Sequence, residues 1–179
     1  MEEEKKKNGF WEFVKIVVIS LAIVFPIRAY VAQPFVVSGE SMEPNFSDGQ
    51  YLIIDEISYR FKEPQRSDVI VMYSPVQPST FLIKRIIGLP GEEIKIENGN
   101  VIITKKDFSR FVLNEDYLPS GLKTQPDSNI LIKENEYFVL GDNRTRSSDS
   151  RVWGVLSNKN IKGRVLLRLW PINKISLFN

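Results

Sequence analysis

Residues 93–103, EIKIENGNVII, contain the clearest local fold signal in the chain. Apolar residues alternate with polar ones on both sides of Asn98-Gly99. Alternation with a period of two is typical of a strand with one buried face, and Asn-Gly is a preferred central pair for a type I′ hairpin turn. The stretch therefore predicts a β-hairpin.

Short β-rich runs on either side of this hairpin extend the prediction to most of the chain. They lie between Pro, Gly, Asp and Asn residues, and no segment after residue 33 shows a sustained helical period. The expected strands are Phe35–Val37, Tyr51–Ile54, Asp68–Tyr73, Phe81–Ile87, Tyr137–Leu140 and Lys162–Leu169. We therefore expect a mainly β domain over residues 33–179, from which the polar segment 104–135 departs as an insertion or flap.

Residues 10–32 form a mostly apolar run near the N-terminus. Its uninterrupted centre, 16–27, is shorter than the roughly 20 helical residues that a bilayer core requires, so a signal-peptide core or a buried helix is one interpretation. Lys15 and Arg28 can extend their charged ends to the membrane surface, however, and aromatic residues lie at both ends of the run. No small-residue cleavage pattern follows it. We expect a transmembrane helix over 10–32, with an amphipathic surface helix as the alternative.

The flanking charges predict the orientation of this helix. Lys5, Lys6, Lys7 and Lys15 lie on its N-terminal side, against Arg28 alone on the other. Lysine and arginine are enriched on the cytoplasmic side of membrane spans. We therefore expect residues 1–9 to be a cytoplasmic tail and residues 33–179 to lie outside the cytoplasm, in a single-pass plasma-membrane protein.

The composition excludes several kinds of chemistry. The chain has no Cys and no His, which rules out disulfides, a thiol nucleophile, an imidazole base and the common zinc sites. A net charge of only +2 is not the footprint of a nucleic-acid-binding protein. We expect no metal, no cofactor and no nucleic-acid partner, although a cation site made of carboxylates alone stays open. Hydrolysis would have to use Lys, Asp, Glu or a hydroxyl group.

Ser41 lies in the stretch GESMEP, residues 39–44. Gly39 can bring the backbone close to a ligand, and Pro44 stiffens the far side, so the stretch could present a side chain and a backbone N–H. Ser41 could equally cap a turn.

Lys84 lies beside Arg85 in an apolar strand-like run, FLIKRIIGLPG, residues 81–91. One of two adjacent cations in such a strand must face apolar surroundings. Burial lowers the pKa of a lysine, and a neutral amine near a serine hydroxyl can act as its general base. The alternative is an edge-strand lysine that discourages aggregation.

Residues 141–154, GDNRTRSSDSRVWG, form a dense polar loop after the apolar strand Tyr137–Leu140. The loop could be a solvated turn. It could also supply hydroxyls and Asp–Arg pairs that orient a catalytic group.

Taken together, three motifs resemble those of type I signal peptidases, membrane-anchored Ser/Lys proteases that remove signal peptides from exported proteins. They are SGESMEP (38–44), IKRIIGLPGE (83–92) and GDNRTRSSDSRVWG (141–154). The apolar N-terminal run stands where that family has its anchor. The resemblance implies a signal-peptidase-like β-sheet catalytic domain that cuts membrane-tethered preproteins after small residues of the Ala-x-Ala type.

The resemblance also implies roles for particular residues. Ser41 would be the nucleophile that forms an acyl-enzyme, and Lys84 its general base. The backbone N–H of Ser41 would be one oxyanion donor. Some family members have a serine hydroxyl donor two residues earlier, where this chain has Gly39, so a backbone N–H near Gly39, or Ser38, would have to replace it.

Further residues would support these groups or contact the substrate. Ser147 would orient the lysine amine. The expected supporting pairs are Asp149 with Arg151 and Asp142 with Arg85. The expected lining of the substrate pockets is Phe35, Val37, Met42, Leu82 and Ile83. Asn45 stands where the family commonly has threonine, a change we expect to be tolerated.

Two other functions compete with this one. A LexA-like self-cleaving Ser/Lys protease shares the dyad but would need a DNA-binding or regulatory N-terminal part. A membrane-anchored, non-catalytic β module would bind a partner, with Ser41 and Lys84 purely structural.

Overall fold

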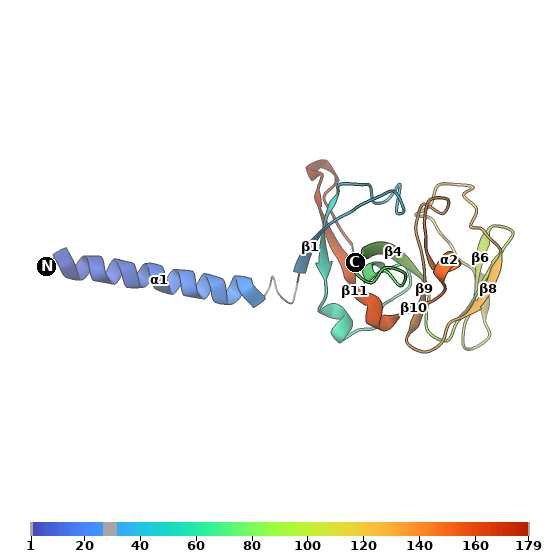
Figure 1. Cartoon of the computed structure of the whole chain (residues 1–179), viewed down its shortest axis with the longest axis horizontal. Helices are drawn as coiled ribbons and strands as arrows, with labels where there is room; N and C mark the ends of the chain where they lie inside the picture. Colours follow the sequence, from blue (N-terminus) through green and yellow to red (C-terminus); the bar gives the residue numbers. More distant parts are fainter. Residues whose placement is uncertain (1, 27–31, 179) are drawn as a thin grey trace.

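A computed structural model describes residues 2–26 and 32–178 of the 179-residue chain. It consists of one long helix, α1 (Glu2–Pro26), and a β domain from which the helix stands apart (Figure 1). Among the described residues the helix includes Glu2 onward, so residues 2–9 of the expected tail belong to the same helix.

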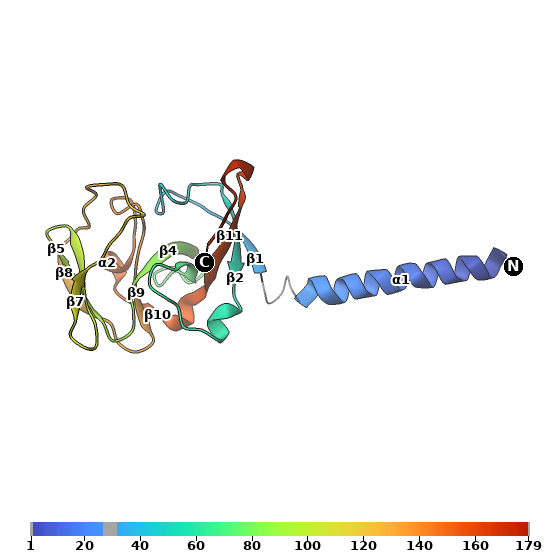
Figure 2. The ribbon, with the colours of Figure 1, turned by 180° about the vertical axis from the view of Figure 1, so that it is seen from behind.

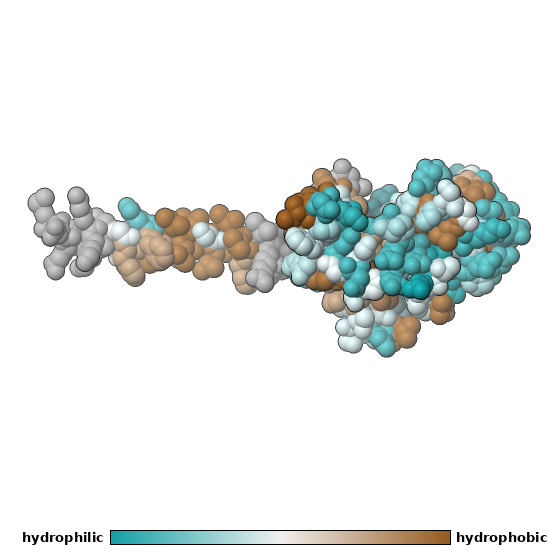
Figure 3. Space-filling model, turned by 90° about the horizontal axis from the view of Figure 1, so that it is seen from above, coloured by the Kyte–Doolittle hydropathy of each residue, from teal (hydrophilic) through white to brown (hydrophobic). Residues whose placement is uncertain are grey.

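The side chains of α1 from Phe10 to Phe25 are mostly apolar and exposed, and they cover much of its surface in Figure 3. Within residues 2–26 and 32–178, no helix is both long and apolar enough to cross a membrane. The membrane-spanning segment expected over 10–32 includes residues 27–31, which lie outside the described residues.

Two antiparallel sheets form the β domain. The larger has the strand order β1-β2-β11-β3-β4-β9-β10, with β12 paired to β11. Its strands are β1 (Ala32–Val36), β2 (Tyr51–Asp55), β3 (Val69–Tyr73), β4 (Phe81–Gly88), β9 (Glu136–Leu140), β10 (Leu156–Ser157), β11 (Ile161–Trp170) and β12 (Ser176–Leu177). The short helices are η2 (Ser58–Arg60), α2 (Ser150–Trp153), η3 (Asn158–Asn160) and η4 (Ile172–Lys174).

The smaller sheet has the order β7-β6-β5-β8 and lies at the end of the domain away from α1 (Figures 1 and 2). Its strands are β5 (Glu93–Glu97), β6 (Asn100–Thr104), β7 (Arg110–Val112) and β8 (Ser128–Leu131). Residues 104–135, which we expected to form an insertion or flap, therefore supply its two outer strands.

The predicted hairpin and the mainly β class are confirmed. Strands β5 and β6 pair with Glu97 opposite Asn100. Asn98 and Gly99 between them have φ values of 55° and 87°, the positive values that a type I′ turn requires. The six other predicted strands coincide with β1, β2, β3, β4, β9 and β11 to within a few residues at each end.

The two sheets share a hydrophobic core. Its buried residues come from β4, β5, β6, β9 and the segment after β8: Ile87, Ile94, Ile96, Val101, Ile103, Ile132, Phe138 and Leu140. Gly88 ends β4 at this junction, where a Cβ would overlap the side chains of Ile132 and Ile94. A glycine here lets the smaller sheet pack directly on the larger one, which bears the site described below.

We predict that Ile94→Ala lowers the free energy of unfolding by about 2–5 kcal/mol, because it leaves a cavity in the shared core. Ile94 is 0% exposed, whereas Leu131 on the neighbouring strand is 68% exposed. The matched control Leu131→Ala should change stability by less than about 0.5 kcal/mol. Denaturant unfolding of the full chain in detergent measures both. Equal losses in the two variants would show that the smaller sheet does not share the core.

Candidate active site

Ser41 lies in a turn that connects β1 to β2. The turn is closed by hydrogen bonds from Phe46 N to Met42 O (2.9 Å) and from Glu43 N to Glu40 O (3.1 Å). The side chains of Met42 and Phe46 are buried in the core of the larger sheet and fix the turn from below. Ser41 itself stays partly exposed, held on a well-anchored backbone.

Lys84 reaches this serine from β4. Its Nζ lies 2.8 Å from Ser41 Oγ and donates a hydrogen bond of 2.9 Å to Ile83 O. The lysine is only 2% exposed. The fold thus brings together the two candidate catalytic residues, Ser41 from the connection between β1 and β2 and Lys84 from β4, which are far apart in sequence.

Burial lowers the pKa of Lys84 to about 8, from an ordinary value of 10.5. Asp149 and Asp142 act in the opposite direction, because their negative charges favour the ammonium form, while Arg151 lowers the pKa further. A large share of the amine is therefore neutral near pH 8. A neutral amine at hydrogen-bond distance can accept the proton of the serine hydroxyl.

The loop that follows β9 packs against the turn of Ser41. Asn143 N donates to Ser41 O at 3.0 Å. A Cβ at Gly141 would overlap both Ser41 O and Ser147 Oγ, so only glycine allows this close approach. Ser147 Oγ is buried and has no hydrogen-bond partner among the described residues. The expected bond from Ser147 to the Lys84 amine is thus absent from this structure, where the amine instead contacts Ile83 O and Ser41 Oγ.

Asp149 and Arg151 form a buried ion pair at the end of this loop. Arg151 donates to the Asp149 carboxylate from Nε (2.8 Å) and from Nη2 (2.7 Å). The same carboxylate accepts from Gly141 N at 3.0 Å, and Arg151 Nη1 donates to Gln125 O at 2.7 Å. The ion pair therefore ties the end of the loop to its start at Gly141 and to the neighbouring segment at Gln125.

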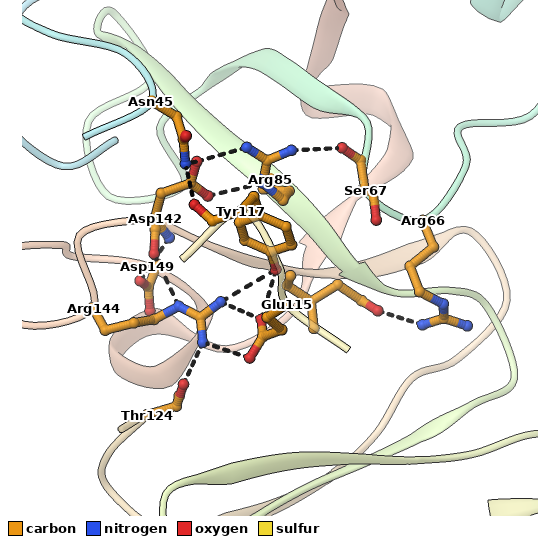
Figure 4. A network of polar contacts seen from close by, with 12 residues as sticks. Asn45, Arg66, Ser67, Arg85, Glu115, Tyr117, Thr124, Asp142, Arg144 and Asp149 are labelled. Atoms are coloured by element: carbon orange, nitrogen blue, oxygen red, sulfur yellow. Dashed lines mark hydrogen bonds and ion pairs between the residues drawn. The ribbon is translucent and has the colours of Figure 1, made fainter. Parts of the chain in front are cut away.

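Asp142 and Arg85 form a second pair, in bidentate geometry, with Nε–Oδ1 at 2.8 Å and Nη2–Oδ2 at 2.6 Å (Figure 4). Asn45 Nδ2 donates to Asp142 Oδ2 at 2.8 Å. This carboxylate thus connects β4, the 141–154 loop and the turn of Ser41. Sequence reasoning noted Asn45 only as a departure from the family and missed this contact.

An apolar cavity of about 80 Å³ opens beside Ser41. Its lining consists of Phe35, Val36, Val37, Ser38, Ser41, Leu52, Val71, Phe81, Leu82 and Ile83. Of the predicted lining residues, Met42 does not reach it, because its side chain points into the core and is fully buried. Leu52 and Val71 were not predicted. They come from β2 and β3, and only the pairing of strands in the folded sheet brings them to the cavity.

The backbone N–H of Gly39 already donates a hydrogen bond within the protein. It donates to Asp48 Oδ1 at 2.7 Å, so it is not a free oxyanion donor in this structure. Ser38 lines the same cavity as Ser41. Across residues 2–26 and 32–178 there is no group of three or more carboxylates placed to hold a metal ion.

We predict that the Lys84 amine titrates near pH 8 and that Asp149→Asn lowers its pKa further, because the Asp149 charge favours the ammonium form. The Cε resonance of ¹³C-labelled lysine, assigned by its loss in Lys84→Ala, reports the titration. Glu134→Gln, which removes the carboxylate paired with the exposed Lys106, is the control and should leave Lys84 unchanged. Titration of Lys84 at its ordinary value of 10.5 would contradict the burial argument.

Comparisons with known proteins identify the family of the chain. The family model described as "Signal peptidase, peptidase S26" matches residues 10–170. The protein named "Probable signal peptidase I-2" of Synechocystis sp. is 34% identical over 98% of this chain and 80% of its own length. A signal peptidase I of Leptolyngbya laminosa is 33% identical, over 97% of this chain and 86% of its own length.

Among solved structures, a crystal structure of a signal peptidase I from Enterococcus faecalis V583 is 32% identical and superposes with a TM-score of 0.49, covering 57% of this chain and 97% of that one. The family match spans both the turn of Ser41 and the loop after β9. On these sequence matches, the chain belongs to the signal peptidase family, peptidase S26.

Proposed function

We propose that this chain is a type I signal peptidase, a serine endopeptidase that removes N-terminal signal peptides from exported preproteins. The single observation that carries the proposal is the buried Lys84 amine 2.8 Å from Ser41 Oγ, at the edge of an apolar cavity. Relatives that are about a third identical over nearly the whole chain are named as signal peptidases I.

Acylation would use these two side chains in turn. The neutral Lys84 amine accepts the Ser41 hydroxyl proton while Oγ attacks the scissile carbonyl carbon. The Lys84 ammonium then gives that proton to the departing amine, the C–N bond breaks, and the mature protein leaves. The signal peptide stays bound to Ser41 as an ester. In the second half, Lys84 takes a proton from water, the resulting hydroxide attacks the ester, and Ser41 Oγ regains its proton.

The negative charge on the attacked carbonyl oxygen needs hydrogen-bond donors. We assign one donor to the backbone N–H of Ser41, and such a group is worth about 3 kcal/mol of transition-state stabilisation. Since the N–H of Gly39 is held by Asp48, we assign the second to the hydroxyl of Ser38 on the cavity wall. Ser147, whose buried hydroxyl has no partner in the described part of the chain, is the group we assign to the protonated amine.

The cavity supports a preference for small side chains. A volume of about 80 Å³ with apolar walls accepts an alanine methyl group and excludes bulk by shape. Strand β9 pairs with β4 only from Arg85 onward, so among the described residues Phe81–Ile83 keep one side free of strand partners. An extended substrate could add itself there by main-chain hydrogen bonds and place alternate side chains in the cavity.

We also propose that residues 10–32 anchor the chain in the plasma membrane, with the N-terminus in the cytoplasm and the β domain outside it. The exposed apolar surface of α1 supports this, as do exposed apolar residues at the end of β11 and in the segment that follows it: Trp170, Ile172, Ile175 and Leu177. The preprotein is held in the same bilayer by its signal peptide, so a membrane anchor would bring enzyme and substrate together.

Mixing the full chain with a preprotein in detergent should release the mature protein. We predict that Ser41→Ala and Lys84→Ala each reduce the rate by at least about 10³-fold, because each removes a group that takes part in bond making. The exposed residues Ser79 and Lys62 provide matched controls, and Ser79→Ala and Lys62→Ala should retain activity. Normal cleavage by either site variant would favour a non-catalytic binding module.

The pH dependence of kcat/KM should follow the Lys84 amine. Because its pKa is lowered to about 8, activity should be full above that pH and decline as the pH falls and the amine is protonated. Asp149→Asn, if it lowers that pKa, should move the decline to lower pH. A profile that stays flat between about pH 9 and pH 5 would rule out Lys84 as the base.

A further inference from the structure

One residue outside the three motifs contacts all of the segments that carry them. Tyr117 lies in the connection between β7 and β8, within the segment 104–135 to which no function is attached above. We propose that Tyr117 is a positioning residue that holds the Ser41 turn, β4 and the 141–154 loop in register with one another. The proposal rests on the proposed function and deepens it.

The first contact is with the turn of Ser41. Asn45 Nδ2 donates one hydrogen bond to Tyr117 O and another to Asp142 Oδ2, both at 2.8 Å (Figure 4). An amide nitrogen has two hydrogens, so both are satisfied here. Asn45 is four residues after Ser41. The main-chain carbonyl of Tyr117 therefore helps to fix the orientation of the Asn45 side chain in the turn of Ser41.

The second contact is with β4, the strand that carries Lys84. The guanidinium of Arg85 lies 4.1 Å from the centroid of the Tyr117 ring, a cation–π geometry. Arg85 directly follows Lys84, and its side chain is only 11% exposed. The ring therefore contacts the cation of the Arg85–Asp142 ion pair, whose carboxylate is fully buried.

The third contact runs through the Tyr117 hydroxyl, which donates to Glu115 Oε1 at 2.6 Å. Glu115 forms a bidentate ion pair with Arg144, whose side chain is buried. Arg144 Nε donates to Gly141 O at 3.1 Å, and its Nη1 contacts Thr124. Gly141 is the residue whose missing side chain lets the loop approach Ser41.

These contacts form a network in which every charge has a partner: Arg85 with Asp142, and Arg144 with Glu115. Buried charges are tolerated when they are paired and hydrogen-bonded, and such networks restrict their members to one arrangement. Tyr117 is the common neighbour of both pairs. Because a misplacement of about 1 Å can cost on the order of 100-fold in rate, a residue that fixes these segments affects catalysis without touching the substrate.

The test compares Tyr117 with a tyrosine in a similar local environment. Tyr59 in η2 is also partly buried, and its hydroxyl donates to Asp68 Oδ2 at 2.7 Å, but it makes no contact in this network. The variants Tyr117→Leu, Tyr117→Phe, Tyr59→Leu and Tyr59→Phe are made in the full chain in detergent. For each we measure Tm, kcat and KM on a preprotein, and the pKa of Lys84 by ¹³C NMR.

We expect Tyr117→Leu to lower kcat by about 10- to 100-fold while KM changes by less than about threefold. The pKa of Lys84 should rise toward 10.5 as water enters the loosened site. Tyr117→Phe keeps the ring over Arg85 but loses the hydroxyl contact with Glu115, so its kcat should lie between those of Tyr117→Leu and the unmodified chain. The Tyr59 variants should lower Tm to a similar extent but leave kcat and the Lys84 pKa unchanged.

Two results would overturn the proposal: a kcat for Tyr117→Leu within about twofold of the unmodified chain, or equal losses of kcat in the Tyr59 and Tyr117 series. If the unmodified chain itself cleaves no preprotein, the proposed function has failed. The pKa of Lys84 alone then tests whether Tyr117 positions the site. A Lys84 pKa that is the same in Tyr117→Leu and the unmodified chain would then refute the positioning role.

Discussion

The site depends on the burial of one lysine amine next to one serine hydroxyl. Lys84 is 2% exposed, and none of the ion pairs among residues 2–26 and 32–178 includes it. An ammonium group in such a place would lose its hydration without gaining a bonded counter-charge, so the neutral amine is favoured. The chain has no histidine, and this lowered pKa lets a lysine take the role that an imidazole has elsewhere.

The surrounding charges are arranged so that they do not cancel this effect. Asp142 and Asp149 are both buried near Lys84, and each raises its pKa. Each carboxylate is also bound in bidentate fashion by an arginine, Arg85 or Arg151. The arginines satisfy the carboxylates, whose remaining acceptor capacity is used to hold Gly141 and Asn45. The same two ion pairs therefore limit how far the two carboxylates raise the pKa of Lys84, and they fix the backbone around it.

Sequence predicted the parts of this molecule that local patterns encode. The hairpin over 93–103 was identified because its turn and its alternation both act over a few residues. Strands β7 and β8 were missed because they are short and form only by pairing with β6 and β5. Ser41 and Lys84 looked ordinary by themselves, and only their joint resemblance to one family singled them out.

What the sequence did not predict is the set of contacts made across the fold. The family resemblance implies Met42 as a pocket residue, but the turn directs its side chain into the core. The contacts of Tyr117 with Asn45 and Arg85 join three distant segments and have no local signature. The hydrogen bond expected from Ser147 to the Lys84 amine is absent from this structure, where the Ser147 hydroxyl has no partner among the described residues.

The most direct test of the central claim is to trap the covalent intermediate. The full chain is mixed with a preprotein, the reaction is stopped with acid during turnover, and the digested enzyme is mapped by mass spectrometry. We predict that the signal peptide is attached through an ester to the peptide that contains Ser41, and that Lys84→Ala gives no such adduct. An adduct on another side chain, or one that forms equally well without the Lys84 amine, would contradict the Ser41–Lys84 dyad.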